Sequence, residues 1–194
     1  ITLDAITADN IINFTEAGLL SIPVSGVTTG TNVGDPIIVT VGASTYNTVV
    51  LAGNTFSVNV LMADLQANTG LSVTASVSTT DVAGNIGSAS DAQTYVFDTT
   101  LPAPTIAIDM NTVAGDDVMN LAESGQTQTI TGTTTGANAG DIVTLTINSK
   151  TFQGAVAADG TFSIQVPGSD LAADADSIID ASITTTEASG NSGS

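Results

Sequence analysis

Carboxylate and amide side chains recur at matching spacing in two parts of this chain. The first set is Asp4, Asp9, Asn13 and Glu16, and the second is Asp109, Asp116, Asp117, Asn120 and Glu123. All of these side chains offer oxygen donors, and calcium in proteins takes about 6–8 oxygen ligands from carboxylates, amides, backbone carbonyls and water. Asp and Asn are also ordinary turn formers, so a structural role is the alternative. The recurrence of the whole set favours calcium binding.

Smaller oxygen-rich pairs lie elsewhere in the chain. Asp81 with Asn85, and Glu187 with Asn191, flank a glycine in two similar stretches. Each pair is either a further calcium ligand set or a hydrogen-bonded turn, and the sequence leaves both interpretations open. A last carboxylate, Asp98, comes directly before a segment with two prolines.

Catalysis is disfavoured by the residue types that are missing. The chain has neither histidine nor cysteine, so the usual Ser–His and Cys–His nucleophile pairs cannot form, and disulfides and thiolate metal sites are excluded with them. Paired carboxylates could hydrolyse glycosides, but the chain has no tryptophan and only 4% aromatic residues to hold a sugar. The glycine-rich residues 26–34 and 132–140 carry no lysine and lead into no helix, so they do not match phosphate-binding loops.

The charge balance restricts the possible partners. The sequence has 19 acidic residues against a single base, Lys150, and a formal net charge of −18. Nucleic acid is excluded as a partner because phosphate binding needs clustered Lys and Arg, and anionic membrane surfaces are disfavoured for the same reason. No apolar run approaches the roughly 18 residues of a membrane span, so we expect no membrane insertion. A fold this acidic repels itself, and a bound cation would reduce the repulsion.

Two copies of one module make up the chain. Most of the second copy follows the first at an offset of 106 residues, because Gly26 matches Gly132 and the stretch NTFSV at 54–58 matches GTFSI at 160–164. Between the copies, Pro102 and Pro104 interrupt regular strand pairing and predict a short, stiff connection. We therefore expect one domain at residues 1–98, a linker at 99–104 and a second domain at 105–194.

Alternating apolar and polar residues predict an all-β fold. In the first copy we expect strands at residues 1–6, 20–27, 36–41, 46–51, 55–60, 71–78 and 93–97, separated by Gly, Asn and Asp turns. Seven short strands per copy are typical of an immunoglobulin-like β-sandwich, here without the Cys and Trp residues of antibody domains. The prediction is therefore two tandem seven-stranded sandwiches joined by a short proline-containing linker. The second copy stops before the counterpart of its last strand, so we expect it to lack that strand and the chain to be part of a longer array.

One helical turn is predicted in each copy, at residues 63–67 and 169–174. Ser169 or Asp170 would cap the second turn. The leucine in each turn would close the end of the core.

In such a sandwich, the loop between the first two strands lies at the end where the last strand leaves. This would place Asp9, Asn13 and Glu16 close to Asp98. The loop carrying Glu187 and Asn191 would face the same linker.

Taken together, the motifs resemble the bacterial Ig-like repeats of giant surface adhesins, the biofilm-associated and RTX-type adhesins exported by type I secretion. The resemblance rests on DTTLPAP at 98–104, IAID at 106–109, AGDDVMNLAESG at 114–125, TGTTTG at 131–136, ADGTFS at 158–163 and DVAGN at 81–85. It covers essentially the whole chain.

The resemblance implies an extender module, one of many tandem domains in an extracellular stalk on the bacterial cell surface, with calcium stiffening the domain junctions. The residues it carries over as metal ligands are Asp98, the five acidic and amide residues of the second set, and the four of the first. This chain departs from the pattern in two places, since Glu187 replaces the expected Asp and Asn10 replaces an acid.

The sequence is compatible with two functions. The first is a calcium-rigidified spacer whose partners are neighbouring repeats of the same chain, with any host or surface ligand bound by other regions of the full-length protein. The second is a ligand-binding adhesin domain that contacts a glycan, a host protein or a solid surface. A binding domain should differ from its neighbour in long loops, and these two copies do not.

Overall fold

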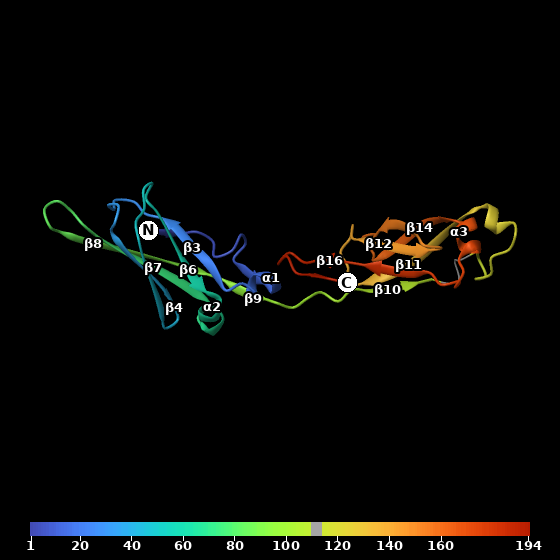
Figure 1. The fold of residues 1–194 in the computed structure, drawn as a ribbon, viewed down its shortest axis with the longest axis horizontal. Coiled ribbons are helices and arrows are strands. Elements are labelled where there is room, and N and C mark those ends of the chain that lie inside the picture. Colours follow the sequence, from blue (N-terminus) through green and yellow to red (C-terminus); the bar gives the residue numbers. More distant parts are fainter. Residues whose placement is uncertain (110–113) are drawn as a thin grey trace. The chain divides into compact units, whose positions relative to one another are not determined.

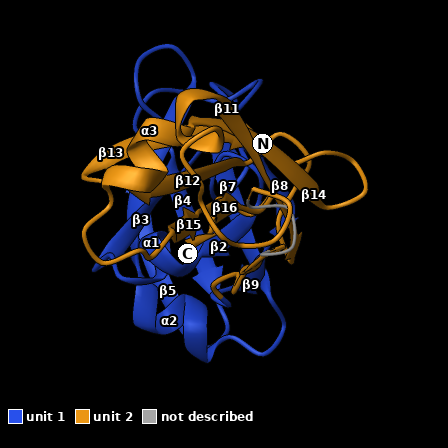
Figure 2. Ribbon diagram, turned by 90° about the vertical axis from the view of Figure 1, so that its right-hand side faces the viewer, with its two compact units in different colours: residues 1–100 blue, residues 101–194 orange. Residues whose placement is uncertain are grey.

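The computed structural model describes residues 1–109 and 114–194. The chain divides into two compact units, Ile1–Thr100 (unit 1) and Leu101–Ser194 (unit 2), each built mainly from strands (Figures 1 and 2). Within the described ranges, no helix has both the length and the apolar character needed to cross a membrane.

Unit 1 contains two antiparallel sheets and one parallel pair of strands. The first sheet has the order β1 (Thr2–Leu3), β3 (Ser21–Val27) and β6 (Thr55–Leu61), and the second the order β5 (Ser44–Val49), β4 (Pro36–Val41), β7 (Ser72–Thr80) and β8 (Ile86–Thr94). The parallel pair is β2 (Ile11–Asn13) with β9 (Val96–Asp98). Short helices α1 (Phe14–Ala17) and α2 (Met62–Ala67) follow β2 and β6. This is the all-β, Ig-like arrangement that the alternating pattern predicts.

The core of unit 1 follows directly from that alternation. Successive side chains of a strand point to opposite faces, so the apolar residues at every second position face inward. On β4, Ile37, Val39 and Val41 are all buried, and Phe56 of β6 and Val73 of β7 belong to the same core cluster. Leu65 of α2 is fully buried in this cluster, which confirms the predicted role of the leucine.

Unit 2 repeats this architecture. Its sheets have the orders β10 (Thr105–Ile108), β11 (Thr127–Thr135), β14 (Thr161–Pro167) and β13 (Lys150–Ala155), β12 (Ile142–Ile147), β15 (Asp180–Ile183), with a small hairpin of β16 (Thr185–Thr186) and β17 (Ser192–Gly193). The 3-10 turn η2 spans Glu123–Gly125, and α3 spans Gly168–Ala173. Register is repeated as well, because Gly26 pairs with Phe56 in unit 1 and Gly132 pairs with Phe162 in unit 2.

The last strand of unit 1 begins earlier than predicted. The sequence suggested residues 93–97, whereas β8 starts at Ile86 and pairs with β7 from Thr80↔Ile86 to Ser72↔Thr94, forming a long hairpin (Figure 1). Residues 86–90 are exposed, so this edge strand shows no inward apolar pattern from which it could be found. Strand β2 was also missed, because three residues are too few to show an alternating pattern.

The predicted cap of the second helical turn is wrong. The N-cap of α3 is Pro167, which has no side-chain capping bond. Asp170 lies inside the first turn, where its buried carboxylate accepts the Lys150 ammonium at 2.5 Å. This lone base therefore neutralises one acid of unit 2.

Candidate metal-binding residues

Parallel pairing of β2 and β9 brings the first predicted ligand set to the exit of unit 1. The pair has Asn13 opposite Asp98, and the Val96 amide donates to the Asn10 carbonyl at 2.9 Å to start the ladder. A left-handed residue, Asn10 with φ of 62°, turns the chain into β2. Asn and Asp adopt this conformation more readily than most residues. Asn13 and Asp98 therefore lie at the adjacent ends of these two strands.

Glu16 is held beside Asn13 by a capping box. The Asn13 side-chain oxygen accepts the Glu16 amide at 3.0 Å, while a Glu16 carboxylate oxygen accepts the Asn13 amide at 3.1 Å. The first backbone amides of a helix have no intrahelical acceptor, and each of these two side chains accepts a hydrogen bond from one such amide at the start of α1. The structure therefore places Asn13 opposite Asp98 and holds Glu16 beside Asn13.

Two other predicted ligands of unit 1 have local hydrogen-bonding partners. Asp9 accepts the Ile11 amide at 2.9 Å and the Thr7 hydroxyl at 3.1 Å through one oxygen, which is a turn-forming role. Asp4 accepts the Ser25 hydroxyl at 2.7 Å, so its side chain lies along β3. These bonds connect Asp4 to the β1–β3 pair, and not to Asn13 or Glu16.

Unit 2 repeats the capping arrangement around η2. Asn120 accepts the Glu123 amide at 3.1 Å and the Ala122 amide at 2.9 Å, and Glu123 accepts the Asn120 amide at 2.9 Å. Asp116 accepts the Val118 amide at 3.1 Å. The side-chain oxygens of Asp116, Asn120 and Glu123 are therefore held in place by hydrogen bonds from nearby backbone amides.

The remaining acids of the second set are exposed. Asp117 is the counterpart of Asn10 in the repeat, and its φ of 63° is close to the 62° of Asn10. Asp109 continues from β10 and its amide donates to the Thr131 carbonyl at 2.8 Å.

The Asp81–Asn85 pair forms a hydrogen-bonded turn at the tip of the β7–β8 hairpin. One Asp81 oxygen accepts the Ala83 and Asn85 amides, each at 2.8 Å, and the other accepts the Asn85 side-chain amide at 2.9 Å. These bonds, above all the one from the Asn85 side chain, lower the pKa of Asp81 from its ordinary value. The pair thus forms a hydrogen-bonded turn, and calcium binding by it stays a prediction.

The Glu187–Asn191 pair folds in the same way. The Glu187 amide donates to the Asn191 carbonyl at 2.9 Å, and the Gly190 amide donates to the Glu187 carbonyl at 3.0 Å. Asn191 is buried, whereas its counterpart Asn85 is exposed. A backbone-bonded turn explains why Glu replaces Asp here without loss of the loop.

Across residues 1–109 and 114–194, no three acidic side chains converge on one point. An ion held by these residues would need amide and backbone carbonyl oxygens or water beside one or two carboxylates. Such an all-oxygen donor set suits calcium, a hard cation, and does not suit metals that prefer nitrogen or sulfur.

Comparison with known proteins finds relatives among solved structures. A Ca2+-stabilised adhesin with which an Antarctic bacterium reaches out and binds ice matches at 38% identity and a TM-score of 0.82, over 98% of this chain and 45% of that one. A 1.5-MDa bacterial ice-binding adhesin matches at 37% identity and a TM-score of 0.81, over 98% of this chain and 60% of that one. A bacterial immunoglobulin-like domain of the M. primoryensis ice-binding adhesin matches 50% of this chain and 94% of its own at 35% identity, with a TM-score of 0.46.

A scan against protein-family models finds no match, and neither does a search of curated proteins. The chain spans 45% and 60% of the first two adhesin structures, so it corresponds to part of each. Identity above one third over nearly all of this chain, together with the same all-β fold, agrees with the repeat motifs in the sequence. The chain belongs to the bacterial Ig-like repeat domains of large adhesins.

Proposed function

We propose that this chain is a calcium-rigidified extender module of a large bacterial surface adhesin, and that it supports cell adhesion or biofilm formation by spacing other domains from the cell. The observation that carries the proposal is the pairing of Asn13 with Asp98 beside Glu16, where unit 1 leads into the proline-containing segment. Support comes also from the adhesin relatives, one of which is Ca2+-stabilised.

The proposed modules are two tandem seven-stranded sandwiches. This count treats β8 and β9 of unit 1 as two parts of one strand interrupted at Tyr95, and β2 as an outlying part of the first strand. Pro102 and Pro104 restrict the backbone between the sandwiches. A short stiff linker and an ion at its start would limit bending between neighbouring repeats, which are the proposed partners.

Asn13, Glu16 and Asp98 are the proposed ligands in unit 1, with Asn120 and Glu123 as their counterparts in unit 2. The bound ion would supply positive charge to a chain of net charge −18 that contains one base. Weak extracellular calcium sites work at about 10⁻⁴–10⁻³ M, which suits a protein exported to the cell surface. Type I secretion is the export route we propose, from the resemblance to RTX-type adhesins.

A thermal melt paired with small-angle X-ray scattering tests this function. We expect millimolar calcium to raise the melting temperature and lengthen the particle relative to excess chelator, because an ion that binds the folded state stabilises it. Asp98→Ala should remove most of the lengthening and less of the stabilisation. Asp159→Ala, which removes an exposed turn carboxylate from unit 2, is the matched control and should leave the response intact.

If neither melting temperature nor length responds to calcium, the extender proposal fails in its calcium-dependent form. If Asp98→Ala leaves the calcium response unchanged, other acidic residues bind the ion. Binding of a glycan or a host protein by this chain alone would favour the ligand-binding alternative.

A further inference from the structure

The two prolines between the repeats lie at inward positions of unit 2. From residue 101, where unit 2 begins, side chains alternate between exposed and partly buried, and Pro102 and Pro104 are partly buried in step with Ile106 and Ile108 of β10. Such alternation is the geometry of a strand. Residues 101–104, here called the strap, therefore continue the line of β10 along unit 2.

Two glycines of unit 2 let the strap lie against it. A Cβ at Gly193 of β17 would overlap the Pro102 carbonyl oxygen, and one at Gly136 would lie 3.5 Å from the Ala103 carbonyl oxygen and 3.6 Å from the Pro104 Cα. Gly193 has no positive φ, so its backbone conformation does not require glycine. The close approach of the strap does.

A side-chain amide joins the two walls that contact the strap. The Asn138 side-chain nitrogen donates to the Thr185 hydroxyl at 3.0 Å and to the Thr186 carbonyl at 3.1 Å. These bonds connect the loop after β11 to the β16–β17 hairpin, and Thr185 is buried beneath them. The loop and the hairpin are thus fixed to each other on either side of the strap.

Unit 1 shows that the hairpin alone does not need this glycine. The two walls recur there, with Asn32 bridging them as Asn138 does in unit 2. Gly87 is the counterpart of Gly193 at the offset of 106, yet a Cβ at Gly87 would meet only the Thr79 methyl, at an ordinary 3.7 Å. The steric requirement at position 193 therefore comes from the strap.

The prolines favour docking of the strap before any contact forms. Each proline fixes its own φ and pushes the preceding residue toward extended backbone. The strap then loses less conformational entropy on docking than a flexible segment would. Because proline has no N–H, neither Pro102 nor Pro104 leaves an unpaired amide donor where it faces unit 2.

We propose that the strap is a docked part of unit 2, with Gly193 as its main positioning residue, and that bending between the units is confined to residues 99–100. Strand β9 ends at Asp98, so only these two residues separate it from the strap. A shorter joint has a smaller range of bending. The value of this stiffness rests on the proposed extender function, whereas docking itself uses none of the predicted calcium ligands.

Nitrogen-15 relaxation of the full chain tests the docking, in millimolar calcium and again in excess chelator. We expect the Leu101 and Ala103 amides to have order parameters of about 0.85, like a rigid backbone, with lower values at Thr99 and Thr100. Gly193→Ala should reduce the values at Leu101 and Ala103 to below about 0.6. The matched variant in unit 1, Gly87→Ala, should leave them unchanged.

A second pair of variants tests the walls without adding a side chain. Asn138→Ala removes both bonds between the loop and the hairpin, and should lower the order parameter of Ala103. Asn32→Ala removes the equivalent bonds of unit 1 and should not affect Ala103.

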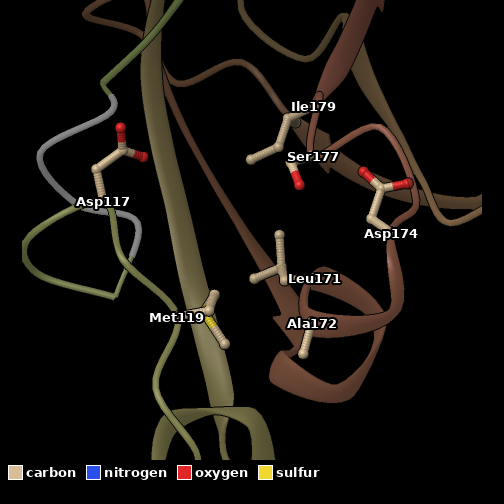
Figure 3. A pocket seen from close by; sticks show the side chains of 7 residues that line it. All are labelled: Asp117, Met119, Leu171, Ala172, Asp174, Ser177 and Ile179. Carbon is tan, nitrogen blue, oxygen red and sulfur yellow. The ribbon is translucent and has the colours of Figure 1, made fainter.

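Leu171→Ala separates release of the strap from a general loss of stability. Leu171 packs against the core of unit 2 and, with Met119 and Ile179, lines a pocket of about 280 Å³ (Figure 3). Its helix, α3, lies at the opposite end of unit 2 from β16 (Figure 1). This variant should lower the melting temperature and leave Ala103 ordered.

Bending is measured by the width of a distance distribution between two spin labels. The chain has no cysteine, so Asn59→Cys on β6 and Gln165→Cys on β14, both exposed, provide one label on each unit. Gly193→Ala should broaden the distribution both in calcium and in chelator. Gly87→Ala should not broaden it.

Three results would overturn the strap: an Ala103 amide as mobile as Thr99 in the unchanged protein, Gly193→Ala that disorders β17 alone, or equal effects of Gly193→Ala and Gly87→Ala. A calcium response without release of the strap in Gly193→Ala would keep the extender function and reject the strap. Release without any calcium response would keep the strap and reject the calcium-dependent function.

Discussion

Asn10 and Asp117 lie in an acid-rich stretch of sequence that suggests metal binding, and both also have a structural role in the backbone. Both have positive φ, at 62° and 63°, where Asn and Asp are favoured over most other side chains. Asn10 also accepts the Ile6 amide at 2.8 Å through its side chain. The replacement of an acid by Asn at this position is therefore explained by backbone geometry, without reference to an ion.

Asp81 allows a prediction at the same scale. Both carboxylate oxygens accept hydrogen bonds within its turn, and these lower its pKa, so the folded state binds a proton there less readily than the unfolded state. The resulting stability is present above the ordinary value of 3.8 and is lost as pH falls through the lowered folded value.

We therefore expect Asp81→Ala to destabilise unit 1 at pH 6 and to reduce the loss of stability between pH 4 and lower values. Urea denaturation at several pH values measures both effects. Asp81→Asn, which retains an acceptor for the backbone amides, should be milder. The calcium response should be unchanged in either variant, and its loss would identify Asp81 as a calcium ligand.

At the scale of elements, close strand pairing depends on two glycines. A Cβ at Gly26 would lie 2.2 Å from the Thr2 carbonyl oxygen and 2.8 Å from the Phe56 ring, and one at Gly132 would lie 2.3 Å from the Ala107 carbonyl oxygen. Glycine here lets the first strand of each unit approach its neighbour above a core phenylalanine. The same requirement in both units explains why the two glycines align in the repeat.

Gly26→Ala should accordingly destabilise unit 1 by about 1–3 kcal/mol, the usual cost of overpacking a filled core. Gly87→Ala is a matched control on β8, because its Cβ would meet only the Thr79 methyl at 3.7 Å. Chemical denaturation of the two variants gives the comparison. Equal stability of both would show that β1 can move away from β3 at little cost.

At the scale of the whole molecule, the dominant property is charge. Of the 19 acidic residues behind the net charge of −18, Asp170 forms an ion pair with Lys150, the one base in the sequence. Such self-repulsion destabilises a compact state and weakens with ionic strength, as the Debye length falls to about 10 Å at 0.1 M salt.

We expect sodium chloride to raise the melting temperature gradually, and calcium chloride at matched ionic strength to raise it further. Screening acts on all charges, whereas a bound ion adds the free energy of a specific site. Differential scanning calorimetry over both titrations distinguishes the two, with magnesium chloride as the divalent control. Coincident curves for all three salts would mean that calcium acts only by screening.

The sequence by itself determined the repeat, the all-β fold and the recurring oxygen donors, because each depends on patterns of nearby residues. Alternation shows which strand face is buried, and spacing shows that Asn13 and Glu16 recur as Asn120 and Glu123. Only the tertiary structure decided that Asp81 belongs to a turn, that Asp170 pairs with Lys150 and that β2 lies beside β9. These outcomes depend on contacts between residues far apart in the chain or on backbone hydrogen bonds, and a side-chain pattern does not encode them.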